Sequence, residues 1–248
     1  MRFVKQTSWA LALCILGGAL TSVANAQNEQ VTRMKAALAS PDRSAKDKDR
    51  DAARKPVETI QFAGIKTGQT VLEVIAVGGW FTEVLSAAVG PTGKVYAQNP
   101  TFFTGRPGFA EAEKAQDDRL KNVTPIHGDL PDASLAGKAD AALTALNLHD
   151  IYNSAGEAAA VALCKGVYDD LKPGGTFTVI DHVGIAGQDN AMFHRIQLAQ
   201  AKEVLTKAGF KIDAESDLLK NPKDDHTKGV RDPSVAGHTD QFLIRAKK

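Results

Sequence analysis

The chain has 248 residues, of which 24% are charged and 43% hydrophobic, and its formal net charge at pH 7 is +1. This length and composition predict one sizeable globular domain and not a disordered chain. The near-zero charge lacks the basic excess with which proteins neutralise nucleic-acid phosphates, so we expect no nucleic-acid partner.

The first 26 residues predict a cleaved signal peptide. Arg2 and Lys5 precede the apolar run WALALCILGGAL, and the sequence ANA at 24–26 has the small residues that signal peptidase accepts. A membrane anchor is the alternative, but the apolar run is shorter than the roughly 20 residues that cross a bilayer. We therefore expect a periplasmic or secreted chain that begins at Gln27 and has no stable membrane span.

Residues 27–56 predict one or two peripheral helices, because this stretch is charged and rich in alanine. Pro56 should end them, since proline disfavours helix in the residue before it. The main domain is then 57–248. After leader cleavage Cys164 is the only cysteine, so no intramolecular disulfide is expected. Its helical, apolar surroundings predict a buried thiol and not a nucleophile.

Strand-like and helix-like segments alternate along most of the main domain. Strands are expected at 70–76, 94–98, 123–129, 139–146 and 175–181, and helices at 81–90, 109–120, 154–171 and 191–209. This alternation predicts an α/β fold of the Rossmann-like type, a mostly parallel sheet with helices on both faces. Two further strand candidates, 210–219 and 241–247, have no long helix between them and predict an antiparallel C-terminal edge hairpin.

The segment VLEVIAVGGWFT at 71–82 predicts a ligand-binding corner. It reads as a strand, a glycine loop and a helix start, which meet where open α/β sheets bind ligands. Glycine lets the backbone approach a ligand closely, and the first amides of a helix can donate to an anionic group. A nicotinamide cofactor is disfavoured, because G-x-G-x-x-G is absent and Gln98-Asn99 replace the expected ribose-binding acid.

Four segments in order, VLEVIAVGGWFTEVL, LNLHD, LKPGG and GHTDQFLI, resemble the bacterial exported "predicted methyltransferase" group of the class I methyltransferase superfamily. The resemblance spans nearly the whole mature chain. It implies a class I methyltransferase sheet with S-adenosylmethionine as cofactor. The implied cofactor-binding residues are Glu73, Gly78, Gly79, Gln98, Asn99, Gly128, Asp129 and Asn147.

Within that set, the resemblance places Gln98 or Asn99 at the ribose and Gly128-Asp129 at the adenine. Asp51 and Arg54 match a D-x-x-R segment of the same group, in which the leading helix closes over the site.

The glycine loop departs from the usual acid-x-Gly-x-Gly-x-Gly of the superfamily, since Glu73 is followed by Ile75, Val77 and Gly79 at these positions. A valine side chain would narrow the site, and β-branching disfavours a left-handed backbone. Two functions therefore stay open. One is methyl transfer to a small or envelope-associated acceptor, and the other is non-catalytic ligand binding on the same scaffold.

Candidate catalytic groups follow the fourth and fifth strands. His149 has an ordinary pKa suited to proton transfer, and with Asp150 it is a candidate base or substrate-orienting group. The alternative is a loop-fixing role for this pair. Candidate substrate residues are Tyr152, His182, His194 and Arg195, the last two on the expected helix at 191–209.

The same segments suggest that three histidines converge above the sheet. No H-x-x-x-H or comparable pair occurs, so the sequence predicts no metal site. It does not specify an oligomeric state.

Overall fold

The computed structural model describes residues 10–248, except for the side chains of 10–23, 111–112 and 115–117. Its sheet has the strand order β3-β2-β1-β4-β5-β8-β7. The parallel strands are β1 (Thr70–Val74), β2 (Lys94–Asn99), β3 (Val123–His127), β4 (Ala139–Ala145) and β5 (Leu171–Gly184).

The carboxyl-terminal edge of the sheet is antiparallel. Strand β8 (Gln241–Lys247) lies between β5 and β7 (Lys211–Ser216) and runs antiparallel to both. The short β6 (Ile196–Gln197) pairs with the end of β5. The predicted mostly parallel sheet with an edge hairpin is thus confirmed. Strand order reverses between β1 and β4, which is where such sheets leave a ligand crevice.

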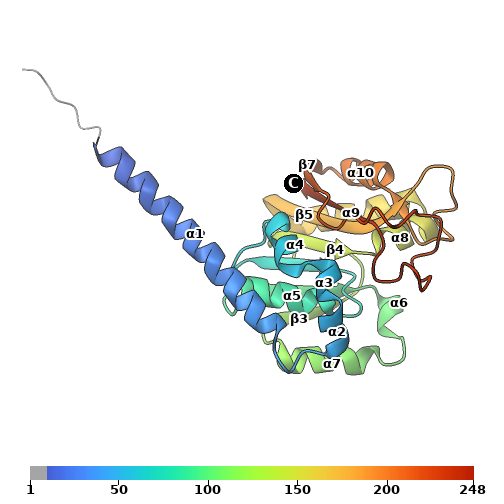
Figure 1. The fold of residues 1–248 in the computed structure, drawn as a ribbon, viewed down its shortest axis with the longest axis horizontal. Helices are drawn as coiled ribbons and strands as arrows, with labels where there is room; N and C mark the ends of the chain where they lie inside the picture. The colour runs from blue at the N-terminus through green and yellow to red at the C-terminus, as the bar shows by residue number, and fades with distance from the viewer. Residues whose placement is uncertain (1–9) are drawn as a thin grey trace, which may run out of the picture.

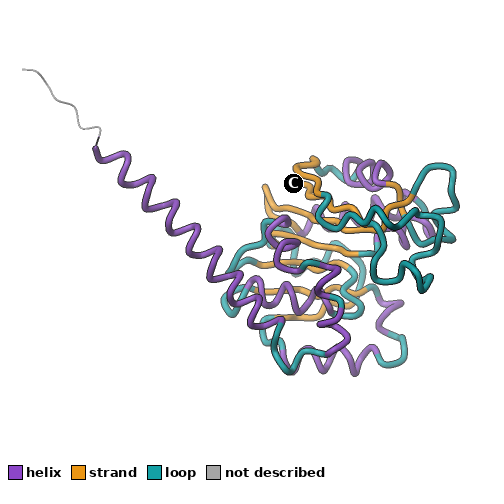
Figure 2. The backbone as a smooth tube through the Cα atoms, viewed as in Figure 1, coloured by secondary structure: helices purple, strands orange, loops and turns teal. Residues whose placement is uncertain are grey.

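Helices cover both faces of this sheet (Figures 1 and 2). One face packs against α4 (Pro56–Ala63) and α5 (Trp80–Val89), and the other against α9 (Glu157–Asp170) and α10 (Leu198–Lys207). Strand β1 is buried on both sides, as expected for a central parallel strand. The remaining helices of the main domain are α6 (Thr101–Thr104), α7 (Phe109–Arg119) and α8 (Leu148–Ala155).

Cys164 of α9 is fully buried, as predicted, and burial raises the pKa of its thiol to about 12. At neutral pH the group is therefore a protonated, unreactive part of the core.

The N-terminal helix α1 (Ala10–Leu38) is continuous across the predicted cleavage position. Its first half extends away from the domain, and its second half lies along α5 (Figure 1). Gln30 donates to the carbonyl oxygens of Ile65 and Ala88, and Met34 is buried in the core. Arg2 and Lys5 lie outside the described residues, and cleavage stays a prediction. Within residues 10–248, no helix combines the length and apolar character needed to span a bilayer.

Two short helices, α2 (Ala45–Asp49) and α3 (Asp51–Arg54), follow α1. Pro56 does not simply end the helical lead-in, as the sequence suggested. Lys55 takes a left-handed conformation, with φ of 44°, and Pro56 then opens α4 at its first position, where proline's missing N–H costs nothing.

The predicted helix at 191–209 begins too early. Helix α10 starts only at Leu198, after a capping box formed by Gln197 and Gln200. His194 has φ of 54°, which is incompatible with a right-handed helix. His194 and Arg195 therefore lie in the loop before α10 and not on a helix.

Candidate functional site

A cavity of about 200 Å³ lies at the predicted ligand-binding corner. Its walls are the loop between β1 and α5, the end of β4, and two arginines of the N-terminal lead-in, Arg50 and Arg54. The cavity thus occupies the crevice where the strand order reverses.

The loop that forms the cavity floor has three residues with positive φ. The values are 59° at Ile75, 37° at Val77 and 69° at Gly79, the three positions where the superfamily pattern has glycine. For a β-branched residue this conformation is an outlier that costs about 1–3 kcal/mol. The chain therefore keeps a glycine-type loop even though branching at two of its positions opposes that conformation.

Two amide side chains at the end of β2 hold this loop. Gln98 Oε1 accepts from the Ile75 N–H at 3.0 Å, and Asn99 Oδ1 accepts from the Val77 N–H at 2.8 Å. Gln98 Nε2 also donates to the carbonyl oxygen of Gly128 at 2.6 Å. Both amides are buried and neither lines the cavity. The predicted contact of Gln98 and Asn99 with a cofactor stays a prediction. In this structure their amides hold the loop in its strained, left-handed conformation.

Gly128, with φ of 143°, has open space where a Cβ would stand, and the neighbouring Asp129 is exposed. Gly78 likewise has open space at its Cβ position, and Gly79 is the N-cap residue of α5. These predicted cofactor residues are therefore accessible to a ligand, apart from the buried Gly79.

Glu73 lines the same cavity and is almost fully buried. Burial raises the pKa of its carboxyl to about 8, against the opposing effect of the hydrogen bond that the Thr82 hydroxyl donates at 2.6 Å. Glu73 is thus mainly protonated at neutral pH.

Trp80, the first residue of α5, joins the lead-in helices α2 and α3 to one side of the cavity. The indole Nε1 donates to the carbonyl oxygen of Asp47 at 3.0 Å and to Asp51 Oδ1 at 3.1 Å, and the Arg54 guanidinium lies 4.8 Å from the ring centroid. Asp51 in turn pairs with the buried Arg43. Trp80 is therefore a buried residue that fixes the lead-in helices, and of the D-x-x-R segment Arg54 lines the cavity.

Arg54 forms no ion pair within the part of the chain that the structure describes. Burial, and then repulsion by Arg50, lower its pKa to about 10, so it remains a cation at neutral pH. By contrast, Arg50 pairs with Asp47. Arg54 is thus a positive charge at the cavity wall that is available to an anionic group.

A second cavity, of about 250 Å³, adjoins the first. Ile75 and Asn147 line both cavities, and Asn147 Nδ2 donates to the Ile75 carbonyl oxygen at 3.1 Å. Phe103 and Arg106 form another wall, with the guanidinium 4.2 Å from the ring centroid. Ile75 and Asn147 thus form the boundary that the two cavities share.

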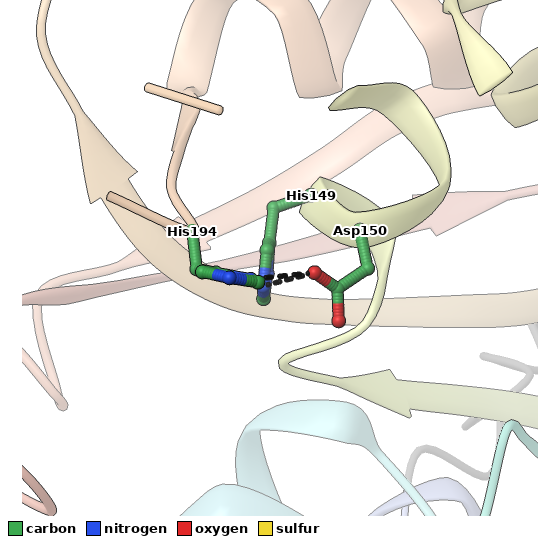
Figure 3. Close-up of side chains that lie close together, drawn as sticks. All are labelled: His149, Asp150 and His194. Atoms are coloured by element: carbon green, nitrogen blue, oxygen red, sulfur yellow. Dashed lines mark hydrogen bonds and ion pairs between the residues drawn. The ribbon is translucent and has the colours of Figure 1, made fainter. Parts of the chain in front are cut away.

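Asp150 lines the second cavity and belongs to a cluster with His149 and His194 (Figure 3). Asp150 Oδ1 lies 3.2 Å from His149 Nε2 and 2.8 Å from His194 Nδ1. On the other side of the ring, His149 Nδ1 lies 2.6 Å from Oδ1 of the fully buried Asp181.

His149 lies between two carboxylates, those of Asp150 and Asp181. Burial alone would lower the pKa of His149, but attraction by Asp181 and hydrogen bonds with Asp150 and Asp181 outweigh it and raise the pKa to about 10. The hydrogen bond with His149 holds the pKa of Asp150 at about 2. Without a bound ligand, His149 therefore carries its proton at neutral pH, and a cation that binds at Nε2 would have to displace this proton.

The predicted convergence of three histidines is present. The ring centroid of His149 lies 5.4 Å from that of His182 and 5.8 Å from that of His194. Burial lowers the pKa of His182 to about 4, so this ring is neutral and shares a hydrogen bond with the Thr239 hydroxyl at 2.6 Å.

The other two candidate substrate residues lie elsewhere. Arg195 is fully buried and pairs with Asp224, and it also donates to the carbonyl oxygens of Val183 and Lys228. It therefore anchors the loop between β7 and β8. Tyr152 packs half-buried against the core.

Sequence reasoning noted Ile75 at a glycine position of the loop but did not assign roles to Arg50 or Asp181. Asp181 follows an apolar strand stretch, which is a recognisable signal. Arg50 is recognisable only from the cavity that it lines.

No protein-family profile matches the chain, and a search of curated proteins found no match. Solved structures do match. A SAM-dependent methyltransferase from Aquifex aeolicus aligns with a TM-score of 0.56 and 18% identity, covering 80% of this chain and 97% of that one. Fibrillarin from Aeropyrum pernix, with natively bound S-adenosyl-L-methionine, aligns at 0.52 and 16%, covering 79% and 76%.

The [4+2]-cyclase SpnF aligns with a TM-score of 0.58 and 20% identity, covering 79% of this chain and 80% of that one. At such identities these similarities define the fold alone. The chain thus has the fold of the class I S-adenosylmethionine-dependent methyltransferases, and its cavity lies in the ligand crevice of that fold.

Proposed function

We propose that this protein is an S-adenosylmethionine-dependent methyltransferase. The observation that carries the proposal is the loop at 75–79, which holds left-handed residues under a cavity although two of them are β-branched. Backbone strain of this kind persists where surrounding contacts impose it, and it clusters at ligand-binding sites. Here the contacts that impose it come from the amides of Gln98 and Asn99.

The residues around the cavity fit the cofactor. Arg54 would bind the carboxylate of its amino-acid part, and the open backbone at Gly78 would admit close approach. Neither cavity alone reaches the ~300–1,000 Å³ of typical ligand sites, but the two adjoining cavities together do. The bound cofactor would supply an electrophilic methyl group on its sulfonium.

The acceptor would lie beside Asp150 in the second cavity, oriented by the His149 and Asp150 pair. Exact alignment of the acceptor atom is the main requirement of such a transfer. We further propose that the protein is exported and acts on a small or envelope-associated acceptor. In support, among the described side chains of α1, from residue 24 onward, those that hold the helix to the domain begin at Gln30 and follow the predicted cleavage position.

A non-catalytic ligand-binding function remains the second candidate. It is favoured by Gln98 and Asn99, whose amides are engaged by the loop and by Gly128 instead of facing the cavity. The similarity to a [4+2]-cyclase also illustrates that a fold does not fix a function.

Calorimetric titration with S-adenosylmethionine and S-adenosylhomocysteine tests the proposal. We expect saturable binding that Arg54→Gln weakens at least ~10-fold, as loss of a charged hydrogen bond predicts. The matched control is Arg245→Gln, which removes an arginine paired with Asp213 on the edge hairpin and should leave binding unchanged. Absence of heat at millimolar ligand would refute the proposal. Binding without methyl transfer to any acceptor offered would favour the second candidate.

A further inference from the structure

Two segments far apart in the sequence bring together two imidazoles and one carboxylate. His149 and Asp150 lie in the first turn of α8, and His194 lies in the loop before β6 (Figure 3). One potential ligand atom from each side chain lies within 4.8 Å of the other two. The sequence predicted no metal site because it contains no closely spaced histidine pair, yet the fold supplies the pair across 45 positions.

The spacing of these atoms fits a coordination shell. Metal bonds of ~2.0–2.2 Å to nitrogen and oxygen place neighbouring ligand atoms ~3.0–3.5 Å apart. Asp150 Oδ1 is 3.2 Å from His149 Nε2 and 2.8 Å from His194 Nδ1. Small side-chain rotations therefore suffice to place all three atoms around one ion.

His149 is oriented by the kind of partner that metal-binding histidines have. Its Nδ1 contacts Asp181 Oδ1 at 2.6 Å, which leaves Nε2 for a ligand. Asp181 is itself fixed, because its carboxylate also accepts from the backbone N–H groups of His149 and His182, both at 2.8 Å. A carboxylate behind a ligating imidazole sets its tautomer and raises its basicity.

His194 is also held in place. Its left-handed backbone is followed directly by Arg195, which is fully buried and paired with Asp224. The third group, Asp150, keeps half of its side chain exposed and lines the second cavity. Buried contacts of Asp181 and Arg195 thus hold the two histidine segments, while Asp150 faces the second cavity.

We propose that His149, Asp150 and His194 bind a divalent transition-metal ion of the iron-to-zinc series, with the remaining coordination positions open to water or an oxygen ligand. Two imidazoles and one carboxylate suit these ions, whereas Mg²⁺ and Ca²⁺ prefer all-oxygen ligands. Three protein ligands leave the site open, as in metal sites that take part in chemistry. The site would exist whether or not the protein transfers methyl groups.

The test uses the full chain, free of any histidine tag and stripped of metal by chelation. Zn²⁺ is titrated by calorimetry, and Co²⁺ is titrated by its visible absorption, which reports nitrogen and oxygen coordination directly. We expect one equivalent of each ion to bind. Asp150→Asn and His194→Asn should each weaken binding at least ~10-fold; asparagine at 194 tolerates the left-handed backbone. Mg²⁺ should not compete.

The matched control is His127→Ala. His127 also pairs with a carboxylate, that of Glu113 at 2.8 Å, but among the side chains that the structure describes no second histidine joins them. This variant should bind Zn²⁺ as the unchanged chain does. Failure to bind a stoichiometric ion, or binding that survives both the Asp150 and the His194 substitution, would overturn the proposal. S-adenosylmethionine titrated into the same samples reports separately on the proposed function, so the two can fail independently.

Discussion

The two walls of the crevice are built in opposite ways. On the β1 side, the loop at 75–79 is a strained backbone with ordinary apolar side chains, held by Gln98 and Asn99. On the β4 and β5 side, the chemistry lies in charged side chains around His149, and the buried carboxylate of Asp181 fixes His149 itself. One wall is specified by backbone conformation and the other by electrostatics.

This difference teaches where each wall should be sensitive. At the wall defined by backbone conformation, the free energy of unfolding should change with substitutions that alter conformational freedom, and only weakly with loss of a charged side chain. At the electrostatic wall, the free energy of unfolding should fall strongly when a buried charged partner is removed and weakly when an exposed one is removed. Three substitution experiments sharpen or break the comparison.

The largest effect should come from Asp181→Ala. It removes a fully buried carboxylate that faces His149 and two backbone amides, so we expect a loss of about 3 kcal/mol in the free energy of unfolding. Asp150→Ala, which removes the half-exposed partner of the same histidine, should cost less than about 1 kcal/mol. Urea denaturation of both variants measures the contrast, and equal losses would break it.

The next effect concerns the pH dependence of stability at Glu73. Burial raises its folded-state pKa to about 8, above the ordinary value of 4.5, so the folded state binds the proton more tightly. The stabilisation of the folded state by this tighter proton binding is fully present below pH 4.5 and is lost as the pH rises through 8. One pKa unit corresponds to about 1.4 kcal/mol, so even half of the shift would contribute about 2 kcal/mol to the free energy of unfolding.

Glu73→Gln should abolish that dependence, because the amide does not titrate. The free energy of unfolding of the unchanged chain, relative to the variant, should therefore fall between pH 5 and pH 9. Parallel pH curves for the two proteins would show that Glu73 ionises normally.

The smallest effect should come from Val77→Gly. Val77 is 39% exposed and has φ of 37°, so glycine relieves strain and loses little packing. We expect a gain of about 0.5–1 kcal/mol after the entropic cost of glycine, together with tighter binding of S-adenosylmethionine. Ala76→Gly, one position earlier at a residue without positive φ, is the matched control and should destabilise by about 0.5–1 kcal/mol. If both substitutions destabilise equally, the loop is not strained.

Most of the fold could be predicted because it depends on local patterns. Apolar runs bounded by glycine and proline placed every long strand, and the absence of a helix before residues 241–247 indicated the antiparallel edge. The start of α10 was missed, since the left-handed conformation of His194 depends on Arg195 and Asp224, which lie 29 positions apart.

The sequence by itself determined the alternation of strands and helices, the place of the crevice at 71–82, and the presence of polar groups after β4 and β5. These follow from hydrophobic periodicity and from the chemistry of single residues. Only the tertiary structure decided that Ile75 and Val77 take the conformations of glycines, and that His149, Asp150 and His194 meet in one cluster. Both depend on long-range contacts. The Gln98 and Asn99 amides impose the loop conformation of Ile75 and Val77. The pairing of β5 with β6 and the buried Arg195 bring His194 to His149 and Asp150.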